Sequence, residues 1–419
     1  MGELDRITGI NTDGPLEFPN FRVRDTPHEK KGYIFDRKEQ IKKDTGDITL
    51  FTVTSTKEFK DFFSVPQRVY RDDPYWVPPF WSEYKDFFKT KNPFWTHADA
   101  QLFTAYKDHD AIGRIAVFID YLYCKTYNEK TGFFGFFECM QDFTCAETLI
   151  HCAQGWLASK GMTVMRGPIN GRIDTGCGFL YTGFGSPPSL LSSYSPRYYT
   201  SFAKKLHMKK TRDQVTYYID LTQPLPQQLT DKARQCRASG ITIRPFSRLH
   251  VKRDKRIWIN LFMDTFTDHW GYVPVSTDEV KSRFGVKNLG WFVDSKLFLF
   301  AEYKKKPIAY IWATPDYNQI FRTMDGHLGP VQILQFLHGK KRINSGKLHL
   351  ICIKKEFRGR NIGSYLNFMI LDEMKKRGYL GAEVGWIDEK NTIAHTTIAI
   401  TGAQEYKRYR VFDKKIKDT

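Results

Sequence analysis

Residues 357–366, FRGRNIGSYL, form a short basic stretch with two glycines between two apolar segments. LHLICI at 348–353 precedes the stretch, and NFMILDEMKKRG at 367–378 follows it. The first segment is typical of a strand, and the second has helical spacing of its apolar residues and ends at a glycine. The stretch is therefore predicted to be the turn from a strand into a helix.

Such a turn has the chemistry of a phosphate site. Successive backbone N–H groups and the positive end of the helix converge on one point, and glycine leaves room for phosphate oxygens. Arg358 and Arg360 would add cationic donors, while Gly359 and Gly363 would give clearance. A basic surface turn without a ligand is the alternative.

The size of the chain indicates two domains. It has 419 residues, of which 41% are hydrophobic and 15% aromatic. Single hydrophobic cores usually stop growing at about 250 to 300 residues, so we expect two cores in a globular protein.

The seven cysteines show no CxxC spacing and no neighbouring His pair at ligand intervals, which favours reduced thiols and argues against a zinc site. The first residues, MGELDRITGINTDG, lack a signal-peptide core, and no apolar run is long enough to span a bilayer. We expect a cytoplasmic protein, soluble or peripheral at the inner membrane face, without a metal.

Charge favours an anionic partner. Lys and Arg number 64 against 46 Asp and Glu, a formal net charge of +18. A phosphorylated cofactor, an anionic membrane or a nucleic acid would each suit this excess, and charge does not choose among them.

Four segments are predicted along the chain. Residues 1–46 are a polar extension, 47–222 are a first domain, TQPLPQQ opens a linker at 223–230, and 231–419 are a second domain. Strand, strand, strand, helix, strand, helix, strand is a plausible order in both halves, so we expect a mixed α/β (α+β) fold of two related domains. The clearest helices are 145–161, 258–270 and 360–378; the clearest strands are 102–120 as a pair, 132–139, 297–303, 308–314, 348–355, 381–387 and 405–416.

Arg358-Gly359-Arg360-Asn361-Ile362-Gly363 resembles motif A of the GNAT acyltransferase superfamily, with Asn361 where that motif usually has its first glycine. Asn391, followed by Gly402 and Ala403, resembles the end of a GNAT domain. The resemblance implies two tandem GNAT-like domains, each a twisted mixed sheet flanked by helices, with acyl-CoA as co-substrate in residues 231–419. It implies that coenzyme A contacts Ile351, Cys352, Ile353, Lys354, Arg358, Gly359, Arg360, Asn361, Ile362, Gly363, Ser364 and Asn391.

The first half resembles a narrower family. YRDDPYWVPPFW (70–81), MRGPIN (165–170) and GFGSPPSLLSSYSPRYY (183–199), with HWGYVPVSTDE (269–279) after the linker, are similar to segments of bacterial double-GNAT-like proteins. That family includes or lies near the bacterial ceramide synthases, which transfer a fatty acyl group to a sphingoid base.

The first domain is predicted to hold no cofactor, because its strand at 132–139 enters a helix through MQDFT without a glycine-rich turn. We expect this half to complete the acceptor pocket. RGPINGRIDTGCGFL and GFGSPPSLL are either loops that line a cleft for an apolar acceptor or plain connections.

Two residues are candidates for proton transfer. His349 is expected to share a strand face with Ile351 and Ile353, either as a general base or as a structural residue. Glu389 is a second candidate, with helix capping as its alternative. Ile398 stands where many GNAT enzymes have an acidic Tyr, so Tyr406, Tyr409 or water would replace it, and Cys352 as a nucleophile is a remote option.

The leading hypothesis is an acyl-CoA-dependent N-acyltransferase that works by direct attack of an amine on a thioester. A long-chain acyl donor with a sphingoid or other lipid amine is one version, and acetylation of a small amine or peptide is another. A carrier-protein thioester would serve equally as donor. From another class, the chain would be a non-catalytic binder of anionic surfaces or nucleic acid on a degenerate GNAT scaffold.

Overall fold

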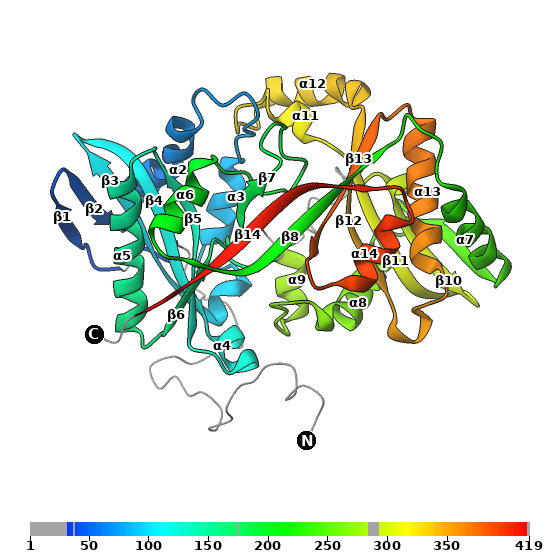
Figure 1. Cartoon of the computed structure of the whole chain (residues 1–419), viewed down its shortest axis with the longest axis horizontal. Coiled ribbons are helices and arrows are strands. Elements are labelled where there is room, and N and C mark those ends of the chain that lie inside the picture. The colour runs from blue at the N-terminus through cyan, green and yellow to red at the C-terminus, as the bar shows by residue number, and fades with distance from the viewer. Residues whose placement is uncertain (1–31, 37, 174–175, 284–292, 417–419) are drawn as a thin grey trace.

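The computed structural model describes residues 32–36, 38–173, 176–283 and 293–416. Its strands form one mixed sheet that runs through the whole molecule, with helices on both faces (Figure 1). The strands follow one another in the order β1-β2-β3-β4-β5-β6-β14-β8-β13-β12-β11-β10-β9, and β7 pairs with β14 off this path. The predicted mixed α/β architecture is confirmed.

The first half contributes most of one end of the sheet. Its strands are β1 (Lys42–Thr45), β2 (Ile48–Thr52), β3 (Ala98–Lys107), β4 (Asp110–Asp120), β5 (Thr131–Cys139), β6 (Val164–Gly167), β7 (Phe179–Thr182) and β8 (Lys209–Asp220). Its helices are α2 (Thr56–Val69), α3 (Trp81–Phe88), α4 (Tyr121–Tyr127), α5 (Phe143–Ser159) and α6 (Tyr198–Lys205).

The second half contributes the other end. Its strands are β9 (Ile241–Pro245), β10 (Phe298–Tyr303), β11 (Lys306–Pro315), β12 (Ser345–Ile353), β13 (Gly381–Asp388) and β14 (Gln404–Lys415). Its helices are α7 (Gln227–Ala238), α8 (Val251–Thr265), α9 (Thr277–Arg283), α11 (Asn318–Phe321), α12 (Pro330–Gly339), α13 (Ile362–Lys376) and α14 (Thr392–Ala399).

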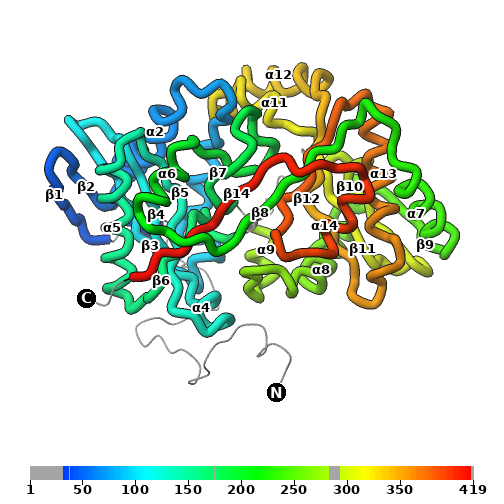
Figure 2. Tube along the Cα trace, in the orientation of Figure 1, coloured from blue at the N-terminus to red at the C-terminus, as the bar shows by residue number. Residues whose placement is uncertain are grey.

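The two halves exchange strands. β8 ends the first half, yet it pairs antiparallel with β13 of the second half as well as with β14. β14 ends the second half, yet it lies between β8 and β6 of the first half. Figure 2 shows these two long strands running side by side across the middle of the molecule. The sheet is therefore continuous because each half is completed by a strand from the other.

Buried side chains also join the halves. One hydrophobic cluster contains Phe118 and Phe133 from the first half together with Trp258, Phe262 and Phe300 from the second. A second cluster packs α13 and α7 against the opposite face of β10–β13. The second-half sheet is thus covered by α7 and α13 on one face and by α8 and α9 on the other.

The helices that periodicity predicts form for the expected reasons. Buried Leu366, Ile370 and Met374 line one side of α13. α5 begins with Asp142, whose side chain accepts a hydrogen bond from the Cys145 N–H at 3.1 Å. It ends just before Gly161, which has φ +75°, a conformation that glycine adopts at little cost.

The structure differs from two predicted segments. The polar extension 1–46 contains β1, which pairs with β2 in register from Lys42 with Phe51 to Thr45 with Ile48; residues 1–31 lie outside the described residues. The predicted linker 223–230 contains the start of α7 at Gln227. Neither β1 nor α7 has a clear regular spacing of apolar residues, and both are stabilised by packing against neighbouring elements. The domain boundaries themselves stay a prediction.

Candidate active site

The turn between β12 and α13 has two residues in the left-handed region. Lys355–Phe357 form a 3-10 turn, and α13 begins at Ile362. Gly359 has φ +80° and Asn361 has φ +58°. Glycine adopts this conformation freely, and Asn tolerates it better than most other residues. Asn361 can therefore stand at this position without breaking the turn.

The backbone N–H groups of residues 359–364 make no hydrogen bond to any residue that the structure describes. The first bond of this kind comes from the Tyr365 N–H, which donates to the Asn361 carbonyl at 3.0 Å. N–H groups in the first turn of a helix lack internal partners and carry the positive end of the helix dipole. This group of donors is therefore available to an anion such as a phosphate.

The two glycines of the turn differ in what surrounds them. A Cβ on Gly359 would meet no atom within 4 Å, whereas a Cβ on Gly363 would lie 3.1 Å from Cγ2 of Thr397. Gly363 therefore lets α14 pack closely on α13, and its clearance for a phosphate stays a prediction. Gly359 supplies the open space and the left-handed backbone.

The two arginines of the turn have different partners. Arg358 donates from Nη1 to Asp268 at 3.3 Å and from Nη2 to the Thr265 carbonyl at 3.5 Å. Lys355 also bonds to Asp268, at 2.9 Å, and these partners lower the pKa of the Asp268 carboxyl. Arg360 packs over the Phe357 ring and forms no ion pair with any described residue. Arg358 thus fastens the turn to the end of α8, and Arg360 is the available cation.

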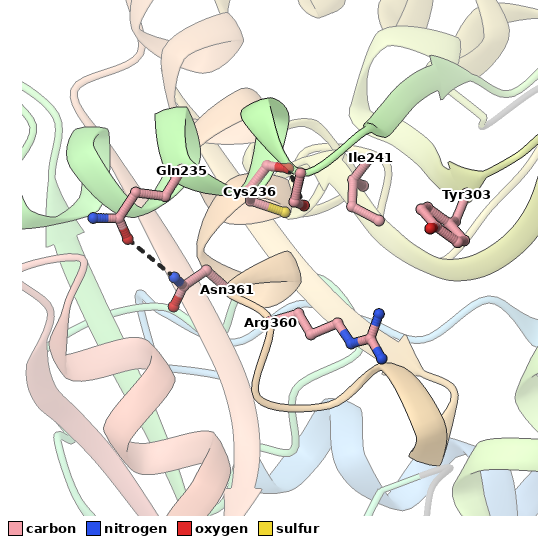
Figure 3. A pocket seen from close by; sticks show the side chains of 7 residues that line it. Gln235, Cys236, Ile241, Tyr303, Arg360 and Asn361 are labelled. Carbon is pink, nitrogen blue, oxygen red and sulfur yellow. Dashed lines mark hydrogen bonds between the residues drawn. The ribbon is translucent and has the colours of Figure 1, made fainter.

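A cavity of about 230 Å³ lies beside the turn (Figure 3). Asn361 is held at its edge by α7, since its Nδ2 donates to Gln235 Oε1 at 3.3 Å and its Oδ1 accepts from Lys232 at 3.4 Å. The helix α7 was not predicted, because the spacing of its apolar residues is weak. The walls are Gln235, Cys236, Ser239, Ile241, Tyr303, Arg360 and Asn361.

β12 and β13 separate as they approach the turn. They pair in parallel from Ser345 with Gly381 to Leu348 with Val384, and no further pair is formed. Beyond that point β12 pairs only with β11, and Lys354 donates to the Ile308 carbonyl at 3.0 Å. Because N–H directions alternate along an antiparallel strand, the amides of Ile351 and Ile353 face the open side.

A bulge in β12 moves His349 to an unexpected face. Trp312 pairs with Leu350 and Ala313 with Leu348, so His349 is the extra residue. Its ring stacks on Trp312 at 4.5 Å between centroids, on the side that Leu350 and Cys352 share, while Ile351 and Ile353 pack on the α13 side. The prediction that His349 shares a face with Ile351 and Ile353 is wrong, because a bulge resets the alternation of a strand.

The environment of His349 keeps its imidazole neutral. Burial, and then the charge of Lys347, hold the pKa of His349 well below its ordinary value. Nε2 and the Thr314 hydroxyl share a hydrogen bond of 2.8 Å. A neutral ring with one fixed partner can accept a proton from a group placed at its other nitrogen.

Cys352 has the environment of a packing residue. Its thiol is buried and lies 3.2 Å from the Tyr310 hydroxyl, and burial raises the pKa of Cys352 to about 11. A thiol in this state is a poor nucleophile at neutral pH. By the alternation of N–H directions, its N–H points toward β11, on the same side as that of Lys354.

The side chains of Glu389 and Asn391 are already engaged. Glu389 accepts from Lys210 at 2.6 Å and from the Asp213 N–H at 3.0 Å. Burial works to raise the pKa of Glu389, but these two partners outweigh it and lower the pKa. Asn391, not Glu389, caps α14 by accepting from the Ala394 N–H at 3.1 Å. The catalytic role of Glu389 stays a prediction.

A tyrosine and a histidine that the sequence analysis did not single out lie near the point where β12 and β13 separate. Tyr217 is opposite Val384 in the sheet, and its hydroxyl lies 2.7 Å from Nδ1 of His395 on α14. His395 Nε2 lies 3.0 Å from the Asp388 carbonyl, which fixes Nε2 as the donor and leaves Nδ1 to accept from Tyr217. Ile398 on the same helix is buried. Only tertiary pairing shows this contact.

The other two tyrosines considered as acids are Tyr406 and Tyr409. Burial raises the pKa of Tyr409 well above its ordinary value, and it also raises the pKa of Tyr406. Both belong to β14, on the far side of β8 from β13. Their substitution for the missing acid stays a prediction.

The equivalent gap in the first half is filled by the chain itself. β5 and β6 pair only from Thr131 to Phe133, and Ile169 then donates to the Phe134 carbonyl at 2.8 Å. The Phe136 N–H donates to Asn170 Oδ1 at 2.6 Å, and a Cβ on Gly135 would overlap the Ile169 carbonyl oxygen. Among the described residues of this half, the gap beside β5 is therefore closed by the chain, and the absence of a cofactor from this half stays a prediction.

The loops that were candidate cleft walls meet around a second, smaller cavity of about 70 Å³. Buried Arg114 and partly buried Glu138 are among its lining residues, and burial raises the pKa of Glu138 to about 7. The loop at 183–192 is also tied to the second half, since Lys347 donates to Ser192 at 3.1 Å and to Glu383 at 2.9 Å. The loops contribute Pro168, Asn170, Gly176, Cys177, Gly178, Phe179, Ser193, Tyr194 and Ser195 to the wall.

The described residues include neither a membrane-spanning helix nor a metal cluster. None of their helices has the length and hydropathy needed to cross a membrane. No group of three or more His, Cys, Asp or Glu side chains among them is arranged to hold a metal ion.

Comparisons with known proteins agree with this geometry. Residues 256–397 match the model of the acetyltransferase (GNAT) family. Protein YghO of Escherichia coli (strain K12) is 27% identical over 375 residues, which cover 87% of this chain and 95% of that protein. The bacterial ceramide synthase of Caulobacter vibrioides is 28% identical over 378 residues, which cover 88% of this chain and 98% of that protein.

Solved structures show the same fold. A tandem GNAT protein from the clavulanic acid biosynthesis pathway superposes with a TM-score of 0.52 at 9% identity, covering 89% of this chain and 99% of that one. A glucosamine N-acetyltransferase region of a fungal β-N-acetylglucosaminidase gives a TM-score of 0.52 at 12% identity, covering 88% and 38%. Residues 256–397 are thus similar to an acetyltransferase domain of the GNAT family, the chain has the fold of tandem GNAT proteins, and these likenesses support an acyltransferase enzyme.

Proposed function

We propose that the protein is an acyl-CoA-dependent N-acyltransferase whose donor site lies in residues 231–419. The observation that carries the proposal is the set of unpartnered N–H groups at 359–364 next to the open edge of β12. A diphosphate suits the N–H groups, and an extended amide-containing arm suits the strand edge. Coenzyme A has both parts, and it supplies an activated thioester.

The residues at the donor site have distinct roles in this proposal. The amides of residues 359–364 and the Arg360 guanidinium bind the phosphates, and Ile351 and Ile353 pair with the arm. Lys354 is excluded from the N–H donors, because its N–H bonds to Ile308. Arg358 positions the turn through Asp268 rather than binding directly. Asn391 acts by capping α14.

An N-acyl transfer forms a C–N bond and breaks a C–S bond, so one proton must leave the amine and one must reach the thiolate. We assign the first task to His349, which is neutral and held by Thr314. We assign the second to Tyr217, with His395 as its hydrogen-bond partner. The Glu389 carboxylate is held by Lys210 and by the Asp213 N–H, so this scheme gives it no proton-transfer step.

The acceptor is proposed to be a lipid amine, with a long-chain acyl group as the part transferred. The relative from Caulobacter vibrioides carries the name bacterial ceramide synthase, and this chain matches it over 98% of its length. The first half, with its filled gap and its described loop residues 168–173, 176–178 and 183–197, would complete the acceptor site. Acetyl transfer to a small amine or peptide is the alternative that an assay distinguishes.

Donor binding is tested by calorimetry with coenzyme A and palmitoyl-CoA. Arg360→Glu should weaken coenzyme A binding at least tenfold, because it places a carboxylate beside the phosphates. Lys57→Glu makes the same charge change at an exposed site on α2 and should leave binding unchanged. Equal binding by both variants would place the donor elsewhere, and binding of a DNA duplex alone would favour the non-catalytic reading.

Acceptor class is tested by mass spectrometry of products. The protein is incubated with palmitoyl-CoA or acetyl-CoA and, in parallel, with sphinganine, a polyamine and a lysine-containing peptide. An N-acyl sphinganine is the expected product. Acetylation of the polyamine or peptide, without acylation of sphinganine, would support the alternative acceptor and refute the lipid one.

A further inference from the structure

The helix α12 has an unusual surface for a water-soluble protein. It has the sequence PVQILQFLHG and no buried residue. Val331, Ile333, Leu334 and Leu337 are each more than half exposed, as is Leu328 just before the helix. Scattered exposed leucines need no explanation, but a group of five on one short segment marks a surface that contacts something apolar.

The position of α12 is set by the residues around it. Phe336 packs on Tyr317 and Phe321 of the α11 segment, with ring centroids 5.3 and 5.9 Å away. Phe321 in turn packs on Phe80 of the first half. Phe336 thus packs the helix against the rest of the molecule, and the aliphatic side chains of the helix are exposed. Figure 1 shows α12 along the outer edge of the molecule, above α11.

Positive charge follows the aliphatic helix directly. Lys340, Lys341 and Arg342 form a 3-10 turn at its end, and all three are exposed. None of them forms an ion pair with any residue in the described part of the chain, and only Lys340 has a ring contact, with Phe336 at 5.4 Å. These three charges are therefore available to an external anion.

We propose that α12 and the Lys340–Arg342 turn are the surface through which this protein binds an anionic phospholipid bilayer. An interfacial helix buries aliphatic side chains at the headgroup boundary while neighbouring cations bind lipid phosphates. The net charge of +18 supports the same partner over a neutral one. A second protein with an apolar groove would not need three unpaired cations at the helix end.

The surface around α12 continues toward the loop at 183–192. Asn318 of α11 donates to the Pro188 carbonyl at 2.9 Å, and Leu190 donates its N–H to Asp316 at 2.9 Å. Leu191 in that loop is 60% exposed. A bilayer bound at α12 would therefore lie near the loop at 183–192. The bilayer-binding proposal does not depend on which amine is the acceptor.

Vesicle flotation tests the proposal with three variants and two lipid compositions. The full chain is mixed with vesicles of phosphatidylcholine alone or with phosphatidylglycerol added. Wild type should float with the anionic vesicles and at least tenfold less with the neutral ones. The double variant Leu334→Glu with Leu337→Glu should lose binding to both, and alanine at Lys340, Lys341 and Arg342 should weaken anionic binding about tenfold or more.

Leu249→Glu is the matched control, because Leu249 is an isolated leucine that is 92% exposed. It should float like wild type. Equal flotation of the wild type and the α12 double variant would overturn the proposal. So would a wild-type dimer in light scattering that the double variant dissociates, since α12 would then be a contact between two copies. Coenzyme A binding by calorimetry should be unchanged in every variant, which separates failure of this proposal from failure of the donor site.

Discussion

His349 occupies the extra position of a strand bulge, and this place determines its chemistry. The bulge moves the ring onto Trp312 and next to Thr314, with Lys347 close enough to help lower the pKa. A histidine on the α13 side would instead be packed among aliphatic side chains. The alternation rule that works for most of β12 fails at this one residue, because the sequence LHLICI carries no sign of the bulge.

His349→Gln tests the base. Glutamine keeps a polar group near Thr314 but cannot take a proton, so kcat should fall by about 100-fold or more while coenzyme A affinity is unchanged. Because the pKa of His349 lies below 6.5, wild-type activity should be constant through neutral pH and fall only as pH drops below 6.5. Steady-state kinetics from pH 5 to 9 measure both effects. If kcat falls less than threefold in the variant, or if the variant still loses activity as the pH drops, His349 is not the base.

The pair Tyr217 and His395 allows a double-mutant test of the proposed acid. Tyr217→Phe removes the hydroxyl, and His395→Gln removes the ring that accepts its proton in the 2.7 Å contact. Groups that act as one unit give non-additive losses. We expect the double variant to lose about as much kcat as Tyr217→Phe alone. Fully additive losses, or no loss in either single variant, would show that the two residues do not act together.

Among the helices and strands, the sequence predicts those whose position depends on a local pattern of residues. The apolar spacing of α13, the glycine after it and the strand before it are all visible in one stretch of chain. α12 was not predicted, because an exposed helix with aliphatic residues on several sides has no clear periodic stripe. The partners of β8 and β14 were not predictable either. Both strands alternate in the ordinary way, and only the packing of two domains decides which strand each one joins.

The exchanged strands are joined by a buried ion cluster that offers a stability test. Asp213 on β8 is fully buried, and it accepts from Arg410 at 2.8 Å and from Arg408 at 3.1 Å, both on β14. Asp213→Asn leaves buried or partly buried cations without their anion, so the free energy of unfolding should fall by about 3 kcal/mol. Urea unfolding followed by circular dichroism measures the change.

Asp110→Asn is the control for this variant, because Asp110 forms a solvent-exposed pair with Arg68 at 2.9 Å. Exposed pairs contribute little to stability, so this variant should unfold almost as wild type does. Similar losses in both variants would mean that the β8–β14 contact is not a special source of stability.

At the scale of the whole molecule, the two halves are expected to fold as one unit. Each half is completed by a strand from the other, so neither half has a complete sheet alone. They also share a hydrophobic cluster and the ion cluster of Asp213 with Arg408 and Arg410. The sequence predicted two related domains but not this dependence, because the boundary near residue 222 looks like a linker when read locally. In the structure it is only the short passage from β8 to α7.

A buried histidine between the halves makes their union dependent on pH. His97, in the first half, lies 2.9 Å from Asp120 through Nδ1 and 2.9 Å from Glu279 of α9 through Nε2. Arg172 also bonds to Glu279, at 3.1 Å. Burial works to lower the pKa of His97, but the two carboxylates outweigh it and raise the pKa to about 9. Both ring nitrogens therefore carry protons at neutral pH, and the charged ring holds α9 against the first half.

The sign of the pH effect follows from the raised pKa. The stabilisation from the charged ring is fully present below pH 6.5 and is lost as pH rises through about 9. The raised pKa corresponds to about 3 kcal/mol in the free energy of unfolding. Lys407 acts in the opposite direction, because burial lowers its pKa to about 8. The test is therefore the difference between wild type and His97→Gln in urea unfolding at pH 6.5 and 9.5. The free energy of unfolding of the wild type should exceed that of the variant at pH 6.5, and the difference should disappear by pH 9.5. An advantage that is the same at both would show that His97 does not carry the charge that joins the halves.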